Sequence, residues 1–89
     1  MIVLDGNKMT TKTELHHEIS FAFNFPNYYG KNLDALWDCL TEYVSLPESV
    51  VWKNFTHSQN YLGDYADKVF SVFEDVSQEL NGFSIRKVK

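Results

Sequence analysis

Short apolar segments typical of strands alternate with longer helical segments along this chain, and this alternation most constrains its fold. Three segments are expected as strands: Met1–Leu4, Val50–Trp52 and Phe83–Ile85. Helical segments separate consecutive strands, and parallel strands require long crossover connections of this kind. The sequence therefore predicts an α/β fold: a three-stranded parallel sheet with about four helices, in the order β-α-α-β-α-α-β.

Capping residues and prolines set the expected helix boundaries. A capping box that begins at Thr11 predicts the start of the first helix, with Thr13 as a competing cap. Pro26 disfavours helical geometry at Phe25, where we expect that helix to end. A second helix is predicted over Asn32–Val44, with asparagine as its N-cap. The second half of the chain predicts a short helix over Asn54–Tyr61 and a longer one from Gly63-Asp64 to about Asn81-Gly82.

Length and composition predict one small folded domain over residues 1–89. A chain of 89 residues can form one core, and 44% apolar residues with 16% aromatics exclude disorder. No basic leader precedes a long apolar run, and no apolar stretch approaches the ~20 residues that span a bilayer. The single cysteine, Cys39, cannot form an internal disulfide and is expected in the core. We therefore expect a cytoplasmic protein without membrane association.

Acidic residues are concentrated in the middle of the chain. Residues 32–79 hold nine of the twelve acids and only Lys53 and Lys68 as bases, a net charge of −7, whereas the flanking residues carry +3. Such a field attracts basic partners and repels phosphate backbones. The basic tail Arg86–Lys89 is too short to reverse this, so no nucleic-acid partner is expected.

The second predicted helix carries a ridge of carboxylates. Asp34, Asp38 and Glu42 follow one another at four-residue spacing and so share a helix face, where like charges cost a few tenths of a kcal/mol per pair. The last helix repeats this spacing with Asp75 and Glu79. Aromatic residues flank the ridge: Tyr28, Tyr29, Trp37 and Tyr43.

Four interpretations of this ridge are open from spacing alone. Paired carboxylates serve general acid–base catalysis, but a convex helix face in a small domain does not desolvate them enough to raise a pKa. Ca²⁺ or Mg²⁺ binding is disfavoured because clustered loop oxygens and a turn glycine are missing. The ridge can also mimic polyphosphate and dock on a cationic cleft, or be a solvated helix face with no partner, which spacing alone slightly favours. The adjacent His16 and His17 point in different directions and are expected at the surface or in a cap, so no metal or cofactor site is expected.

One segment carries a specific family resemblance. The fifteen residues from Asn27 to Thr41, NYYGKNLDALWDCLT, closely resemble the signature loop and helix of the barstar family, intracellular inhibitors of secreted barnase-type ribonucleases. Counterparts continue along the chain, at Asp5-Gly6, Glu14-Leu15-His16, Trp52, Phe55 and the helix from Val69 to Glu79.

The resemblance implies a non-catalytic inhibitor that occludes a ribonuclease active site. The aspartate matching Asp38 takes the place of a substrate phosphate, those matching Asp34 and Asp75 pair with arginines, and the tyrosine matching Tyr28 stacks on the catalytic histidine. Gly30 implies close backbone approach. Further contacts are implied for Asn32, Leu33, Trp37, Thr41 and Tyr43. The expected partner is a secreted barnase-like ribonuclease with a cationic active site, bound 1:1 and without a cofactor.

The sequence departs from the family pattern at the edge of this surface. Tyr43 stands where the family has tryptophan, Asp75 replaces glutamate, Glu42 replaces glycine, and a second cysteine is missing. These changes leave the mechanism in place but open the identity of the partner. The alternative is an immunity protein against a different basic toxin, and a carboxylate-pair hydrolase is a remote third candidate.

Overall fold

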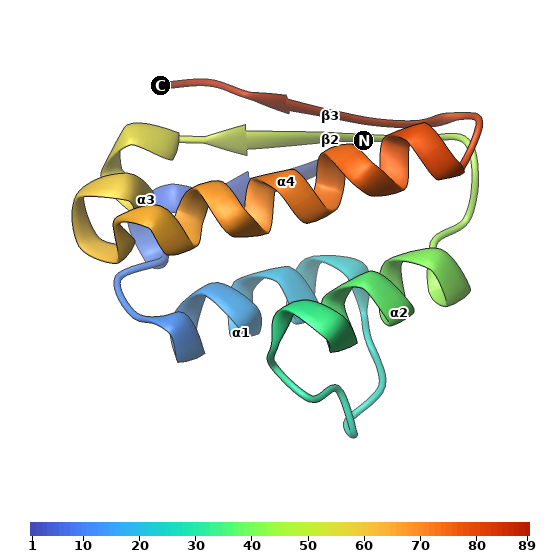
Figure 1. Cartoon of the computed structure of the whole chain (residues 1–89), viewed down its shortest axis with the longest axis horizontal. Helices are drawn as coiled ribbons and strands as arrows, with labels where there is room; N and C mark the ends of the chain where they lie inside the picture. The colour runs from blue at the N-terminus through green and yellow to red at the C-terminus, as the bar shows by residue number, and fades with distance from the viewer.

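The chain folds into a three-stranded sheet and four α-helices in the predicted order, in a computed structural model that describes residues 1–89 (Figure 1). In chain order the elements are β1 (Ile2–Asp5), the 3-10 turn η1 (Gly6–Lys8), α1 (Lys12–Phe23), α2 (Leu33–Tyr43), β2 (Glu48–Lys53), α3 (Phe55–Leu62), α4 (Asp64–Glu79) and β3 (Phe83–Lys87). The expected α/β class, the strand count and the element order are confirmed.

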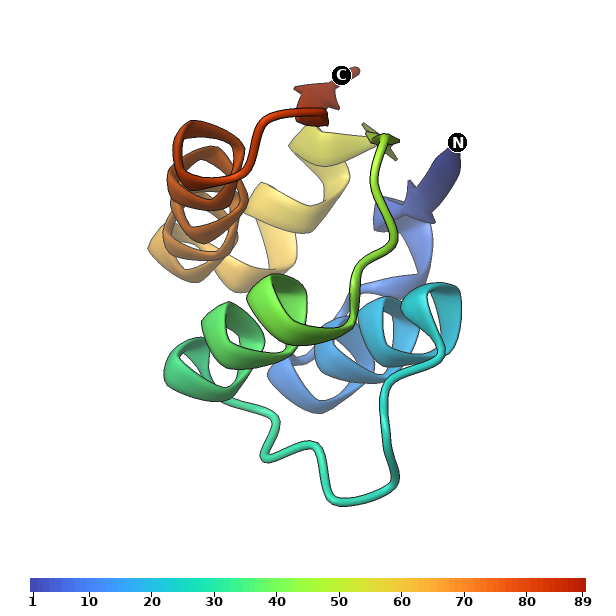
Figure 2. The same cartoon turned by 90° about the vertical axis from the view of Figure 1, so that its right-hand side faces the viewer.

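The sheet is parallel throughout, in the order β1-β2-β3. Ile2 pairs with Val50, and Val50 in turn with Ile85, so that each strand is in register with its neighbour. All four helices lie on one side of the sheet (Figure 2). Val3 and Arg86, whose side chains lie on the opposite side, are exposed. The sheet is therefore covered by helices on one face only.

Aromatic side chains dominate the core between the sheet and the helices. Trp52 of β2 and Phe73 of α4 are completely buried, and their rings meet edge to face with centroids 6.3 Å apart. Phe55 packs against the same tryptophan at 4.7 Å, and Phe83 stacks on Phe73. Burying such side chains contributes about 1.5–3 kcal/mol each, so α4 is firmly fixed to the sheet.

Helix α1 is shorter than the proline rule predicts. It ends at Phe23, and Asn24 closes it in the left-handed conformation (φ 57°), donating its N–H to the carbonyls of Ser20 and Phe21. Asparagine tolerates this conformation better than most residues. The chain then turns back, and Phe25 enters the core as the first residue of the following loop. At the other end, Thr11 caps the helix by accepting from the Glu14 N–H, as predicted.

The 3-10 turn η1, which follows β1, lies in close backbone contact with the start of α3. A Cβ atom added to Gly6 would lie 2.2 Å from the carbonyl oxygen of Asn54, so only glycine fits here. The hydroxyl of the buried Ser58 donates to the Gly6 carbonyl and accepts from the Trp52 indole N–H, at 3.4 and 3.1 Å. The turn expected after the first strand is therefore also part of a buried polar network.

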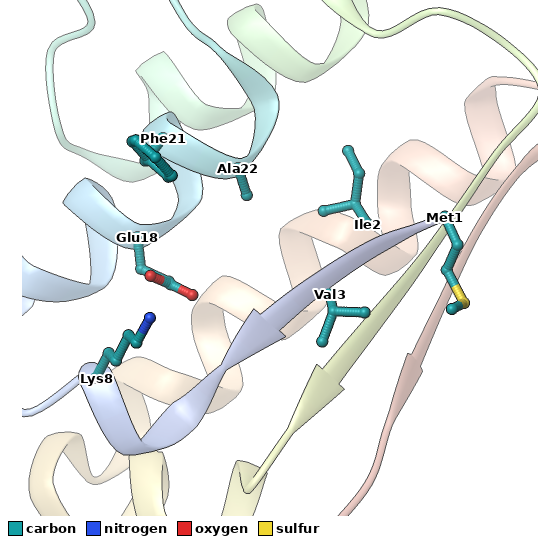
Figure 3. Close-up of a pocket in the computed structure, with 7 residues that line it drawn as sticks. All are labelled: Met1, Ile2, Val3, Lys8, Glu18, Phe21 and Ala22. Carbon is teal, nitrogen blue, oxygen red and sulfur yellow. The ribbon is translucent and has the colours of Figure 1, made fainter.

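An open groove runs along the free edge of β1, beside α1 (Figure 3). We call it the β1 groove; it measures about 340 Å³ and is lined by Met1, Ile2, Val3, Lys8, Glu18, Phe21 and Ala22. Glu18 is half-buried and accepts the backbone N–H of Asp5 at 3.1 Å. Figure 3 shows Lys8 and Glu18 pointing toward one another across the groove.

No helix in the structure is both long enough and apolar enough to cross a membrane.

Candidate functional site

The loop between α1 and α2 projects from the helical side of the molecule, away from the sheet (Figures 1 and 2). Its two tyrosines differ in exposure: Tyr28 is 75% exposed, whereas Tyr29 is 7% exposed and packs against Phe25 with ring centroids 5.1 Å apart. Lys31 adopts the left-handed conformation (φ 53°), which is uncommon for lysine and typical of functional loops. The loop thus has one anchored side chain and one presented to solvent.

A buried histidine anchors the loop. His16 of α1 is 1% exposed, and its Nδ1 lies 2.6 Å from the Tyr29 hydroxyl and its Nε2 2.7 Å from the Tyr65 hydroxyl. Burial lowers the pKa of His16 from 6.5 to about 4, and the charge of Lys31 adds to the shift. The imidazole is therefore neutral at pH 7, so that one tyrosine donates to it and the other accepts.

The prediction that His16 lies at the surface or in a cap was wrong. The sequence did contain a signal, because His16 follows Leu15 and precedes Ile19 by three residues, which places it on the apolar face of α1. A histidine on such a face needs buried partners, and the partners are two tyrosines distant in sequence. Only the tertiary fold brings Tyr29 and Tyr65 to it.

Asn32 begins α2 as predicted. Its side-chain oxygen accepts the Ala35 N–H at 2.8 Å, and its amide nitrogen donates to the Gly30 carbonyl at 3.3 Å. A Cβ on Gly30 would lie 3.3 Å from both Asn32 and Ala35, a tight fit. The cap therefore fixes the angle at which the loop meets the helix, and Asp34 lies in the first turn, where the helix dipole favours a carboxylate.

A small hollow of about 230 Å³ lies between the loop and α2. We call it the tyrosine hollow; it is lined by Tyr28, Tyr29, Gly30, Ala35, Asp38, Cys39, Glu42 and Tyr43. The Tyr28 and Tyr43 hydroxyls are hydrogen-bonded to each other, which joins the loop to the last turn of α2. This bond raises the pKa of Tyr43 to about 12, so its hydroxyl stays protonated at neutral pH. Four predicted site residues therefore surround one cavity: Tyr28, Gly30, Asp38 and Tyr43.

Two carboxylates give the tyrosine hollow a negative charge. The side chains of Asp38 and Glu42 are exposed, and neither carboxylate accepts a hydrogen bond or forms an ion pair within the chain. Both charges affect the buried Cys39 thiol. Burial is the largest cause that raises the pKa of Cys39, and the charges of Glu42 and Asp38 raise it further. No basic side chain lines the hollow. Its charge is therefore left uncompensated within the protein.

A second hollow lies between α2 and α4. We call it the tryptophan hollow; it measures about 640 Å³ and is lined by Trp37, Asp75, Gln78 and Glu79. The structure thus brings two predicted site residues, Trp37 and Asp75, to one hollow, although they are 38 positions apart in sequence. Glu79, which the spacing pairs with Asp75, lies there too. Gln78 was not predicted, and an isolated exposed glutamine gives no sequence signal.

The remaining predicted residues do not line either hollow. The Thr41 hydroxyl donates to the carbonyls of Trp37 and Asp38 within its own helix, and the Asn32 side chain is used in capping. Leu33 is half-buried against the core, and Asp34 is exposed on the first turn. No three His, Cys, Asp or Glu side chains lie close enough together to hold a metal ion.

Comparison of the sequence with models of known protein families shows the family to which this chain belongs. The family model described as "Barstar (barnase inhibitor)" matches residues 1–87. The chain belongs to the barstar family. A protein of Bacillus subtilis (strain 168) named "Putative ribonuclease inhibitor YrdF" is 47% identical to this barstar-family chain over 79 residues, which cover 89% of this chain and 87% of that protein. The family membership expected from the fifteen-residue segment is therefore confirmed, and the match extends over nearly the whole chain.

Proposed function

We propose that this protein inhibits a barnase-like ribonuclease by covering its active site with α2 and the preceding loop. The observation that carries the proposal is the tyrosine hollow, which exposed Asp38 and Glu42 line together with Tyr28 and Tyr43, without any basic partner in the chain. Membership in the barstar family and the name of the Bacillus subtilis relative support the same function.

The chemistry of the ridge suits a site that binds phosphate. A ribonuclease must hold a substrate phosphate with cationic side chains, and a carboxylate makes comparable charge-assisted hydrogen bonds to those groups. In this proposal the Asp38 carboxylate occupies the position of a phosphate oxygen, while Asp34 and Asp75 pair with further cations. The carboxylates of α2 repel one another at four-residue spacing, and binding to a cationic cleft relieves that repulsion.

Aromatic residues supply the rest of the proposed contact. Tyr28 is 75% exposed and Tyr43 is 44% exposed, and both line the tyrosine hollow with Asp38, while half-buried Trp37 lines the tryptophan hollow. Rigid aromatic side chains are typical of binding hot spots because they bury a large area at a small entropic cost. Gly30, Asn32, Leu33 and Thr41 are proposed as neighbouring contacts. No covalent step or cofactor is involved, one inhibitor binds one ribonuclease, and the inhibitor acts in the cytoplasm.

Inhibition of RNA cleavage tests this function. Barnase, as the reference ribonuclease, is titrated with the purified protein and RNA hydrolysis is followed. We expect activity to fall to zero at a 1:1 ratio. Full activity at an excess of inhibitor, with barnase and with the secreted ribonucleases of the source organism alike, would contradict the proposal. Capture of a basic toxin of another class from that organism would then favour the alternative immunity function.

A further inference from the structure

Glu42 lies at the outer end of the tyrosine hollow, one helical turn beyond Asp38. Both residues line the hollow together with the exposed rings of Tyr28 and Tyr43. The hollow of about 230 Å³ is smaller than the ~300–1,000 Å³ typical of small-molecule sites. It therefore suits one or two protein side chains better than a nucleotide or another small ligand.

The surroundings of Glu42 favour a cation. The charge of Glu42 contributes to raising the pKa of both Cys39 and Tyr43, so its field acts on two other residues that line the hollow. Lysine and arginine side chains combine attraction to carboxylates with attraction to the faces of tyrosine rings. The hollow is lined by both kinds of partner, the carboxylates Asp38 and Glu42 and the tyrosines Tyr28 and Tyr43.

Glu42 makes no contact that explains it as a structural residue. It is exposed, forms no ion pair, and its side chain takes part in no hydrogen bond. Its negative charge follows that of Asp38 at like-charge spacing, which costs the isolated helix a few tenths of a kcal/mol. Glu18 provides a contrast, because that carboxylate accepts a backbone N–H and faces a lysine (Figure 3).

We propose that Glu42 is a specificity-determining residue, which pairs with a lysine or arginine at the rim of the ribonuclease active site, beside the phosphate-binding groups that Asp38 contacts. This proposal rests on the proposed function for the class of the partner. A ribonuclease with a cation at that rim binds faster and more tightly than one without, since rim charges steer the encounter.

A double-mutant cycle tests the pairing, with barnase as the probe. Glu42→Gln keeps the size of the side chain and removes its charge, and Glu74→Gln, at an exposed carboxylate of α4 that lines neither hollow, is the matched control. We expect Glu42→Gln to lower the association rate about five- to tenfold at low salt and to weaken its salt dependence, and Glu74→Gln to change it less than about twofold. The thermal stability of Glu74→Gln should match that of the wild type and that of Glu42→Gln should match or slightly exceed it, because the like-charge repulsion with Asp38 is removed. A weaker inhibitor that is no less stable excludes a merely structural effect.

Each lysine and arginine of barnase is then replaced by alanine in turn and combined with Glu42→Gln. We expect coupling with one cation that does not couple with Asp38. Equal effects of Glu42→Gln and Glu74→Gln, or coupling with no cation, would overturn the role of Glu42. Asp38→Ala separates the two proposals: if it abolishes tight inhibition while Glu42→Gln does not, the proposed function stands and this inference fails. If neither variant matters, both fail.

Discussion

Two carboxylate-bearing surfaces of this small domain, the β1 groove and the tyrosine hollow, differ in how their charges are compensated. In the β1 groove Glu18 is half-buried, accepts the Asp5 N–H at 3.1 Å and faces Lys8 (Figure 3). In the tyrosine hollow Asp38 and Glu42 are exposed and have no partner in the chain. The carboxylate of Glu18 is thus satisfied within the chain, whereas those of Asp38 and Glu42 are left without a partner in it. The comparison therefore predicts that changes to the two surfaces affect different properties.

The largest expected effect is on binding, at Asp38. Truncating one partner of a buried, hydrogen-bonded charge pair costs about 2–5 kcal/mol, a range to which the barnase–barstar pair itself contributes. Asp38→Ala should therefore weaken inhibition of barnase about 30-fold or more, mainly through faster dissociation. Kinetics of the complex measure this, and a urea titration should show an unchanged or slightly higher free energy of unfolding. Wild-type inhibition by the variant would refute the role of Asp38.

The free energy of unfolding should depend on pH through buried His16, which holds Tyr29 and Tyr65. Burial lowers the pKa of His16 to about 4, so the unfolded chain binds a proton below pH 6.5 that the folded chain resists. The stabilising effect of the neutral imidazole is complete above pH 6.5 and decreases as the pH falls toward 4, by about 3 kcal/mol in all. Urea titrations across this range measure it.

His16→Gln is the matched control for that pH dependence. Glutamine offers a donor and an acceptor to Tyr29 and Tyr65 but does not titrate, so the decrease between pH 6.5 and 4 should become smaller. An equally steep decrease in the variant would show that other groups cause it.

A change at Glu18 should lower the stability of the protein and leave inhibition nearly unchanged, the opposite of what is expected at Asp38. Glu18→Ala removes the acceptor of the Asp5 N–H, and hydrogen bonds to charged groups are worth about 1.5–3 kcal/mol when buried. Because Glu18 is only half-buried, we expect a loss of about 1 kcal/mol in the free energy of unfolding. Inhibition of barnase should change less than about twofold. A large loss of inhibition would remove the distinction between the two surfaces.

The smallest expected effect is on stability and comes from the repulsion among the carboxylates of α2. Asp38→Asn removes the like-charge repulsion with Asp34 and Glu42 and should raise the free energy of unfolding by a few tenths of a kcal/mol at low salt. High salt should remove the gain, since exposed charges are screened. Thermal unfolding at two salt concentrations measures both, and a destabilised variant would show that Asp38 has a structural role.

Local patterns in the sequence predicted the elements well, because each had its own signal. Thr11 and Asn32 cap helices through side chains that compete for the first N–H groups, and these signals do not depend on the rest of the fold. The end of α1 was misjudged by two residues, because Asn24 adopts a left-handed cap before the proline takes effect. Alternation of strands and helices then fixed the parallel sheet.

Contacts between distant segments could not be predicted from local patterns. The pairing of His16 with Tyr29 and Tyr65, and the meeting of Trp37 with Asp75, depend on how α1, α2 and α4 pack. The carboxylate spacing alone left a solvated helix face as an adequate explanation of the ridge. The family resemblance carried the functional interpretation, and the structure adds that Asp38 lies in a hollow without a basic partner.

Competition with a nucleotide tests the central claim most directly, because a phosphate mimic and a phosphate cannot occupy one site together. The inhibition constant for barnase is measured at increasing concentrations of a guanosine monophosphate that binds the ribonuclease active site. We predict that the apparent constant rises linearly with nucleotide concentration and that no ternary complex forms. An inhibition constant that stays the same at saturating nucleotide would show that α2 and its loop bind elsewhere, and would contradict the account.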